Sequence, residues 1–366
     1  YTSHYFFDFD YAYVNAKKAL EINEIRHSLP YIILGTEQLG IFRLEDRPEN
    51  KINYLKGEKS LKKALELNTN FHHLAFEHLI TLYSHLIEDR NNESEFYINQ
   101  CLKYYFGLGE KKIEDKNIAT LISKNFEKNN FGNNQMDKPF FCLYEKGRVL
   151  SEDDKKEKQL LAFEIFKALS DISSTWGHAE VAESFCEGLF DKTPNTIIGK
   201  SYLEKGISIG SYGAYLLKYD YLRRGACGYQ MDEDEARKLI IRAHETWNNI
   251  TTASHLADNF FFGYGGSTDK QYAIEVISKF AEAGDIDALS DLAYFYAYDS
   301  DDSYYDLDKS IKYLRKSLEN KYFQEKYLSY NRYLLAYNYM VNFFNNNNIN
   351  PDDFYSNGNF PYINLK

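Results

Sequence analysis

The sequence predicts an all-α fold in which pairs of helices stack one after another. A pattern of apolar and small residues recurs at an offset of 36, first as Leu256/Ala257/Phe260 and then as Leu292/Ala293/Tyr296. A glycine loop at 263–266 separates this pattern from a second helical pattern at 273–281. The chain also has 33 Tyr and 26 Phe but only 6 Pro, which suits long helices packed through aromatic faces. Two amphipathic helices per repeating unit indicate a solenoid.

Residues 1–135 repeat less clearly than the rest. We expect a helix over 11–25 that ends near Pro30, and further helices over 74–86, 93–106 and 115–126. Segment 54–68 has Leu61, Ala64 and Leu65 at three- and four-residue spacing and ends in Asn68, as an amphipathic helix does. The Asn- and Gly-rich stretch 129–135 is the expected domain boundary.

Residues 136–344 repeat more sharply. The first-helix pattern recurs as Val181/Ala182/Phe185, Leu217/Lys218/Tyr221, Leu256/Ala257/Phe260, Leu292/Ala293/Tyr296 and Leu335/Ala336/Tyr339. A small residue after the buried one lets neighbouring helices approach closely. A loop glycine permits the positive φ that ends the first helix, and an Asp such as Asp234 or Asp308 faces the positive end of the second helix dipole. Lys218 departs from the small-residue rule, so we expect different packing there.

This pattern of Leu, a small residue, an aromatic residue and a loop glycine resembles Sel1-like repeats, which are relatives of the tetratricopeptide repeat. Segment 54–68 similarly resembles the second helix of a tetratricopeptide repeat. The resemblance implies a right-handed α/α superhelix. It divides the chain into divergent tetratricopeptide-like repeats over 1–135, Sel1-like repeats over 136–344, and an irregular C-terminal tail or cap over 345–366.

Charge and hydropathy exclude some partners. The 366 residues carry a net charge of −11, and acidic residues interleave with the scattered lysines. A chain this acidic repels phosphate backbones, so we expect no nucleic-acid partner. The longest apolar runs are short, so we expect no insertion into a membrane.

The cysteines stand far apart in the sequence, 41 to 44 residues from one to the next: Cys101, Cys142, Cys186 and Cys227. No two form a close pair, and we interpret them as small buried apolar residues that stay reduced. That interpretation places the protein in the cytoplasm. Because the chain begins at Tyr1, a signal peptide could have preceded it, and the periplasm is the alternative.

No catalytic or metal-binding pattern stands out. His78 and His85 share a helix face but lack the spacing and the helical Glu of a zinc enzyme. The acidic loop over 299–308 lacks the central Gly and terminal Glu of an EF-hand. The glycines at 263–266 follow a helix rather than a strand and precede no Lys-Ser/Thr pair, so they do not form a phosphate loop. We therefore expect no enzyme activity, no cofactor and no metal.

The resemblance also predicts a binding surface, because the first helix of each tetratricopeptide-type unit lines the concave side. Projecting that geometry onto this sequence gives a tyrosine-rich strip: Trp176, Glu183, Tyr212, Tyr215, Tyr219, Leu222, Asp258, Phe261, Tyr294, Tyr330, Tyr333 and Tyr337. Tyrosine offers large contact area at low entropic cost and is common in protein-binding surfaces. The alternative is that these rings pack between adjacent repeats.

The first functional hypothesis is a non-enzymatic scaffold that holds a basic protein in an acidic, tyrosine-rich groove. The resemblance to bacterial Sel1-like proteins implies an adaptor, or an immunity protein that neutralises a secreted toxin. The second hypothesis is an enzyme or receptor that binds a glycan or peptide fragment in the same groove, since a fold does not determine a function.

Overall fold

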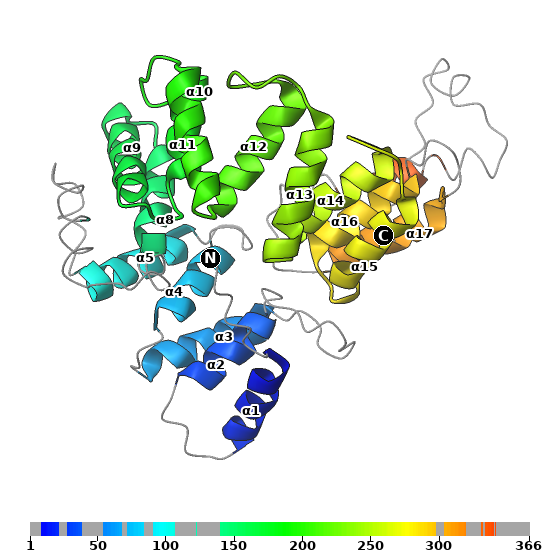
Figure 1. The fold of residues 1–366 in the computed structure, drawn as a ribbon. Coiled ribbons are helices and arrows are strands. Elements are labelled where there is room, and N and C mark those ends of the chain that lie inside the picture. The colour runs from blue at the N-terminus through cyan, green and yellow to red at the C-terminus, as the bar shows by residue number, and fades with distance from the viewer. Residues whose placement is uncertain are drawn as a thin grey trace, which may run out of the picture.

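Helix pairs follow one another along a curved path (Figure 1). The computed structural model describes residues 9–21, 28–38, 54–67, 72–83, 91–106, 122, 140–297, 304–319, 331, 334–339 and 341. Within these residues every regular element is helical, which confirms the all-α class and the helical-repeat superhelix. No described helix is long and apolar enough to cross a bilayer.

Each unit over residues 140–319 contains a first helix and a second helix. The first helices are α8 (Phe140–Ser151), α10 (His178–Glu187), α12 (Tyr212–Arg224), α14 (Ile250–Phe262) and α16 (Ile286–Ala297). The second helices are α9 (Lys156–Asp171), α11 (Thr196–Ser208), α13 (Glu233–Trp247), α15 (Lys270–Glu282) and α17 (Leu307–Leu318). Neighbouring first helices also pack directly against each other, as α10 does with α12 and α14 with α16.

The second helices α11, α13, α15 and α17 begin at N-caps that repeat every 37 positions, at Asn195, Asp232, Asp269 and Asp306. Each side chain accepts a hydrogen bond from a backbone N–H in the first turn, which satisfies one of the helix's free donors. Each cap residue's own N–H donates back to a carbonyl near the end of the preceding first helix. The expected acidic residues at the helix start are therefore present, but the capping positions precede Asp234 and Asp308 by two residues.

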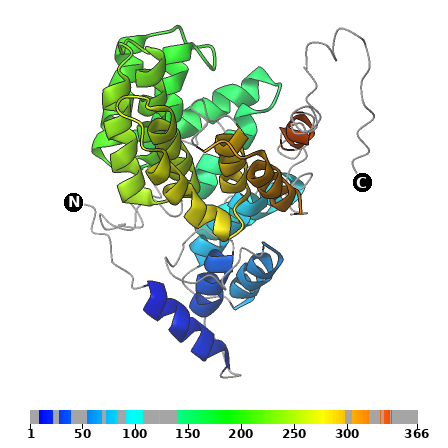
Figure 2. The same ribbon diagram turned by 90° about the vertical axis from the view of Figure 1, so that its right-hand side faces the viewer.

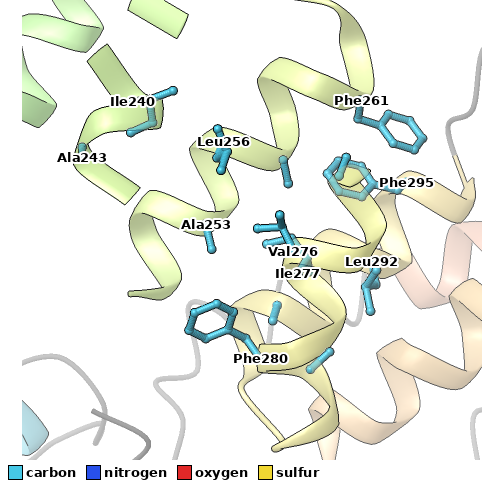
Figure 3. Packing of buried hydrophobic residues seen from close by; sticks show 14 of the residues in the cluster. Ile240, Ala243, Ala253, Leu256, Phe261, Val276, Ile277, Phe280, Leu292 and Phe295 are labelled. Atoms are coloured by element: carbon cyan, nitrogen blue, oxygen red, sulfur yellow. The ribbon is translucent and has the colours of Figure 1, made fainter. Parts of the chain in front are cut away.

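The core between units is aromatic and aliphatic. Phe261 of α14 stacks on Phe295 of α16 with ring centroids 4.2 Å apart, and both rings are fully buried. Figure 3 shows these rings beside Leu256 and Leu292, with Ile277 of α15 in the same cluster. Burying a Phe or Leu side chain contributes about 1.5–3 kcal/mol, so this seam holds consecutive units together.

The N-terminal helices are α1 (Phe9–Glu21), α2 (Leu29–Gln38), α3 (Tyr54–Glu66), α4 (His72–Thr81) and α5 (Asn91–Phe106). The prediction of a helix over 54–68 is confirmed by α3. Pro30 was expected near the end of the first helix, but it belongs to the next one. It lies in the first turn of α2, where a missing N–H costs nothing.

The curved path returns toward its own beginning. Ile286, at the start of α16, is buried in the same apolar cluster as Ile32, Leu61 and Leu79 from α2, α3 and α4. Figure 2 shows the early and late helices on neighbouring parts of the molecule. The predicted boundary at 129–135 and the tail at 345–366 lie outside the described residues, so the domain division stays a prediction.

The interpretation of the cysteines as free, reduced side chains is wrong in this structure. Cys101 is bonded to Cys142 and Cys186 to Cys227, and no free cysteine remains. Each bridge spans 41 residues and joins neighbouring units: α5 to α8, and α10 to the loop that follows α12.

Candidate functional site

Three of the predicted groove residues are structural. Tyr219, Leu222 and Phe261 are 3%, 5% and 1% exposed, and all three belong to the core around α12 to α16. The Tyr219 hydroxyl accepts a hydrogen bond from Nδ2 of the buried Asn259 at 2.6 Å. These side chains present no surface to a partner. The alternative that aromatic rings fill the contacts between repeats describes Tyr219 and Phe261 correctly.

Other predicted aromatic residues lie partly exposed against aromatic neighbours. Trp176 packs on Phe141 and Tyr144 of α8. Tyr212 and Tyr215 both contact the edge or face of Trp247 at the end of α13, with ring centroids 5.2 and 5.1 Å away. Partner binding by these rings stays a prediction.

The remaining aromatic positions lie toward the C-terminal end. Tyr294 is partly buried on α16, and Tyr337 is 38% exposed. Tyr330 and Tyr333 lie outside the described residues. The continuous tyrosine strip that the resemblance implies is therefore broken by buried members in its middle.

A row of carboxylates lies on the first helices instead. We call this the carboxylate row and define it as Glu145 of α8, Glu180 and Glu183 of α10, Asp258 of α14, and Asp287 and Asp291 of α16. Two of its members, Glu183 and Asp258, were predicted as groove residues. Glu183 and Asp258 occupy equivalent places, two residues after Val181 and Leu256.

Two members of the row accept hydrogen bonds from a neighbouring first helix. The Tyr144 hydroxyl of α8 donates to Glu180 of α10 at 2.7 Å. The Ser254 hydroxyl of α14 donates to Asp291 of α16 at 2.5 Å. These bonds join residues 36 and 37 apart, so each crosses from one unit to the next.

Burial raises the pKa of every carboxyl group in the row. The pKa of Glu145 rises to about 7, although Arg148, 3.5 Å away, opposes the rise. The pKa of Asp291 rises to about 7, chiefly by burial and further by the charges of Asp258 and Asp287. The pKa of Asp258 rises to about 6 by burial, against the attraction of Arg223. Asp287 is more exposed than the others. The side chains around its carboxyl group still shield it from water, and this raises its pKa.

The charges of the row act on one another from unit to unit. Glu180 raises the pKa of both Glu145 and Glu183, and Asp220 of α12 adds to the effect on Glu183. Asp258 raises the pKa of Asp291. These interactions couple the acids of α8 and α10 with one another and those of α14 and α16 with one another, while α12 between them carries Arg223 and Arg224 beside Asp220. This local field is what attracts cationic groups.

Three members of the row have no hydrogen-bond or ion-pair partner among the described residues: Glu183, Asp258 and Asp287. Glu183 and Asp258 are partly buried. A carboxylate that is partly withdrawn from water and left unpaired is destabilised, and an added cation would relieve that cost. The described residues hold no group of acidic, His and Cys side chains with the arrangement of a metal site.

The projection from the sequence missed Glu180 and Asp291. Each stands one residue before the buried residue of its helix, Val181 or Leu292. The positions projected to face the groove lie two and five residues from that buried residue, so the position directly before it was not included. An acid at the same place in two units was the available signal.

Two solved structures resemble the chain in outline. A Sel1 repeat protein from Oxalobacter formigenes aligns with 15% identity and a TM-score of 0.44, covering 73% of this chain and 95% of its own. A protective antigen present in uropathogenic Escherichia coli strains, displaying an SLR fold, aligns with 17% identity and a TM-score of 0.41, covering 83% of this chain and 63% of its own. The first is named for the repeat that residues 136–344 resemble, and the likeness concerns the fold alone. No protein-family profile and no curated protein matches the chain.

Proposed function

We propose that this protein is a non-enzymatic scaffold whose carboxylate row holds a basic protein. The observation that supports it most directly is a set of unpaired acids on the first helices α10, α14 and α16: Glu183 and Asp258, which are partly buried, and Asp287, which is exposed. Lysine and arginine side chains of a partner would supply the missing counter-charges. The stabilisation would be larger here than on an open surface, because the surroundings are already poorly solvated.

The proposal relies on charge more than on aromatic rings. Because Tyr219 and Phe261 are buried, the carboxylate row carries the binding in this proposal. Tyr212, Tyr215 and Tyr294 lie at the border of the row. A row of acids gives fast encounter and strong salt dependence, whereas its specificity must come from particular positions along it.

The test compares two variants that each replace three carboxyl groups by amides. The row variant carries Glu183→Gln, Asp258→Asn and Asp291→Asn. The control carries three substitutions at exposed acids on second helices, Glu164→Gln, Glu282→Gln and Asp308→Asn. A fluorescent peptide of alternating lysine and serine serves as the probe, and its anisotropy is followed as a function of protein and salt concentration.

We expect the row variant to weaken peptide binding at least about tenfold and the control variant less than about twofold. The slope of log affinity against log salt should also fall more for the row variant. Equal weakening by both variants would mean that the peptide senses only the net charge, and the row would then not be the binding site.

We also propose that the protein works in an oxidising compartment, which is the extracytoplasmic alternative rather than the cytoplasmic one. The support is that all four cysteines are bonded in pairs. Alkylation of the natively isolated protein without reductant, followed by mass measurement, should show no modified cysteine. An immunity role, which the resemblance implies, is tested by co-purifying the product of the neighbouring open reading frame.

A further inference from the structure

One arginine on the first helices is left without an acidic partner. Within residues 140–297, the helices α8, α10, α12, α14 and α16 carry five lysines and arginines. Four of them form ion pairs: Lys146 with Glu95, Arg148 with Glu145, Lys218 with Glu204, and Arg224 with Asp220. Arg223 forms none with any described residue, although it lies in a strongly acidic region.

The surroundings hold the Arg223 guanidinium in place without neutralising it. Its centre lies 4.5 Å from the centroid of the Tyr264 ring and 5.6 Å from that of Tyr219. Its Nη1 donates to the Tyr219 hydroxyl at 3.4 Å. Its Nε is buried and has no hydrogen-bond partner. Its Nη2 donates to no described residue. A guanidinium stacked on an aromatic face loses little further entropy when it binds.

The titratable side chains nearest to Arg223 do not form an ion pair with its guanidinium. His255 stacks against Tyr219, and burial together with Arg223 lowers its pKa, so it stays neutral near pH 7. Asp258 is influenced by Arg223 but lies beyond ion-pair distance from it. A buried N–H with no acceptor is unfavourable, and an incoming oxyanion would satisfy it.

We propose that Arg223 binds a carboxylate of the polypeptide held on the carboxylate row, and so sets the register of that polypeptide. The fork of Nε and Nη donors matches the two oxygens of a carboxylate. A phosphate is the weaker match, because its second negative charge would be repelled by Asp220 and Asp258. The partner would then be a basic segment interrupted by one acidic side chain or ended by its C-terminal carboxylate.

This inference rests on the proposed function only for the identity of the occupant, and the anion site can be tested alone. The probe is N-acetylglycine, with N-acetylglycinamide as the neutral control and inorganic phosphate as the competing anion, all at matched ionic strength. The reporters are the Nε–H resonance of Arg223 and the backbone amide of Tyr264 in heteronuclear NMR spectra.

We expect N-acetylglycine to shift both reporters saturably, with an affinity at least about tenfold higher than that of either other compound. Arg223→Gln should abolish the saturable shift at Tyr264. Arg224→Gln, the adjacent ion-paired arginine, should leave it intact. Equal shifts with the amide, saturation by phosphate at lower concentration, or the absence of any saturable shift would each overturn the proposal.

A second arm separates this inference from the proposed function. The lysine–serine peptide is compared with versions in which one central serine is replaced by Glu or by Gln. We expect wild-type protein to prefer the Glu peptide, and Arg223→Gln protein to lose that preference. If N-acetylglycine binds at Arg223 while no basic peptide binds the row, the anion site stands and the proposed function fails.

Discussion

Replacing Asp291 by Asn should make the protein more stable at alkaline pH. Asp291 is partly buried on α16, accepts a hydrogen bond from Ser254, and has its pKa raised from 3.8 to about 7. An amide oxygen can accept the same hydrogen bond, so Asp291→Asn keeps the contact and removes only the charge.

The sign and size of this change in stability follow from proton linkage. A carboxyl whose pKa is higher in the folded protein stabilises it fully below the unfolded pKa of 3.8, and that stabilisation is lost as the pH rises to about 7. The full change corresponds to about 4 kcal/mol in the free energy of unfolding. Between pH 5 and pH 8, the stability of the wild type should fall by about 3 kcal/mol relative to Asp291→Asn.

Guanidinium chloride unfolding at a series of pH values, followed by circular dichroism, measures this difference. Asp154→Asn is the matched control, because Asp154 is exposed in the loop between α8 and α9. Its unfolding curves should run parallel to those of the wild type. If the curves of Asp291→Asn also stay parallel to the wild type from pH 5 to pH 8, Asp291 is not withdrawn from water, and the electrostatic account of the row is wrong.

Three other variants test the architecture. Tyr219→Ala should lower the free energy of unfolding by about 3–5 kcal/mol, measured by chemical denaturation, because it empties a buried site rather than a binding surface. Replacing both Cys186 and Cys227 by Ser should cost about 4 kcal/mol in the same assay, from the loop entropy of a 41-residue separation; an unchanged midpoint would refute the bridge. Gly206→Ala should lower the melting temperature, because the added Cβ would lie 2.7 Å from the Cβ of Ala214 and overpack the contact at about 1–3 kcal/mol.

The helix pairs could be predicted from the sequence because local chemistry determines them. The loop glycines Gly188, Gly225 and Gly263 end first helices in the left-handed region, and their φ values are 75°, 66° and 77°. Asn195 and Asp232 cap the second helices that follow. These signals act within a few residues, so a single chain displays them openly.

The packing between units could not be predicted in the same way. Tyr219 and Phe261 stand where a tetratricopeptide-type unit exposes its groove, but here the next first helix covers them through Asn259 and Phe295. Which side chain a neighbouring unit covers depends on the angle between units, and no local pattern records that angle. The disulfide pairing could not be predicted for the same reason. A separation of 41 residues brings two cysteines together only after the units have stacked.

Glu180 and Asp291 are not needed to build the repeat, and this is the strongest reason to connect these two acids with binding. Each first helix has one position directly before the apolar residue that opens the repeated pattern. That position is Glu180 in α10, Leu216 in α12, His255 in α14 and Asp291 in α16. Because the same fold accepts an apolar, a neutral and an acidic side chain at one structural position, packing does not demand a carboxylate there. Burial makes each carboxylate unfavourable at neutral pH. A stability cost that the fold does not require is best explained by a ligand that offsets it when bound.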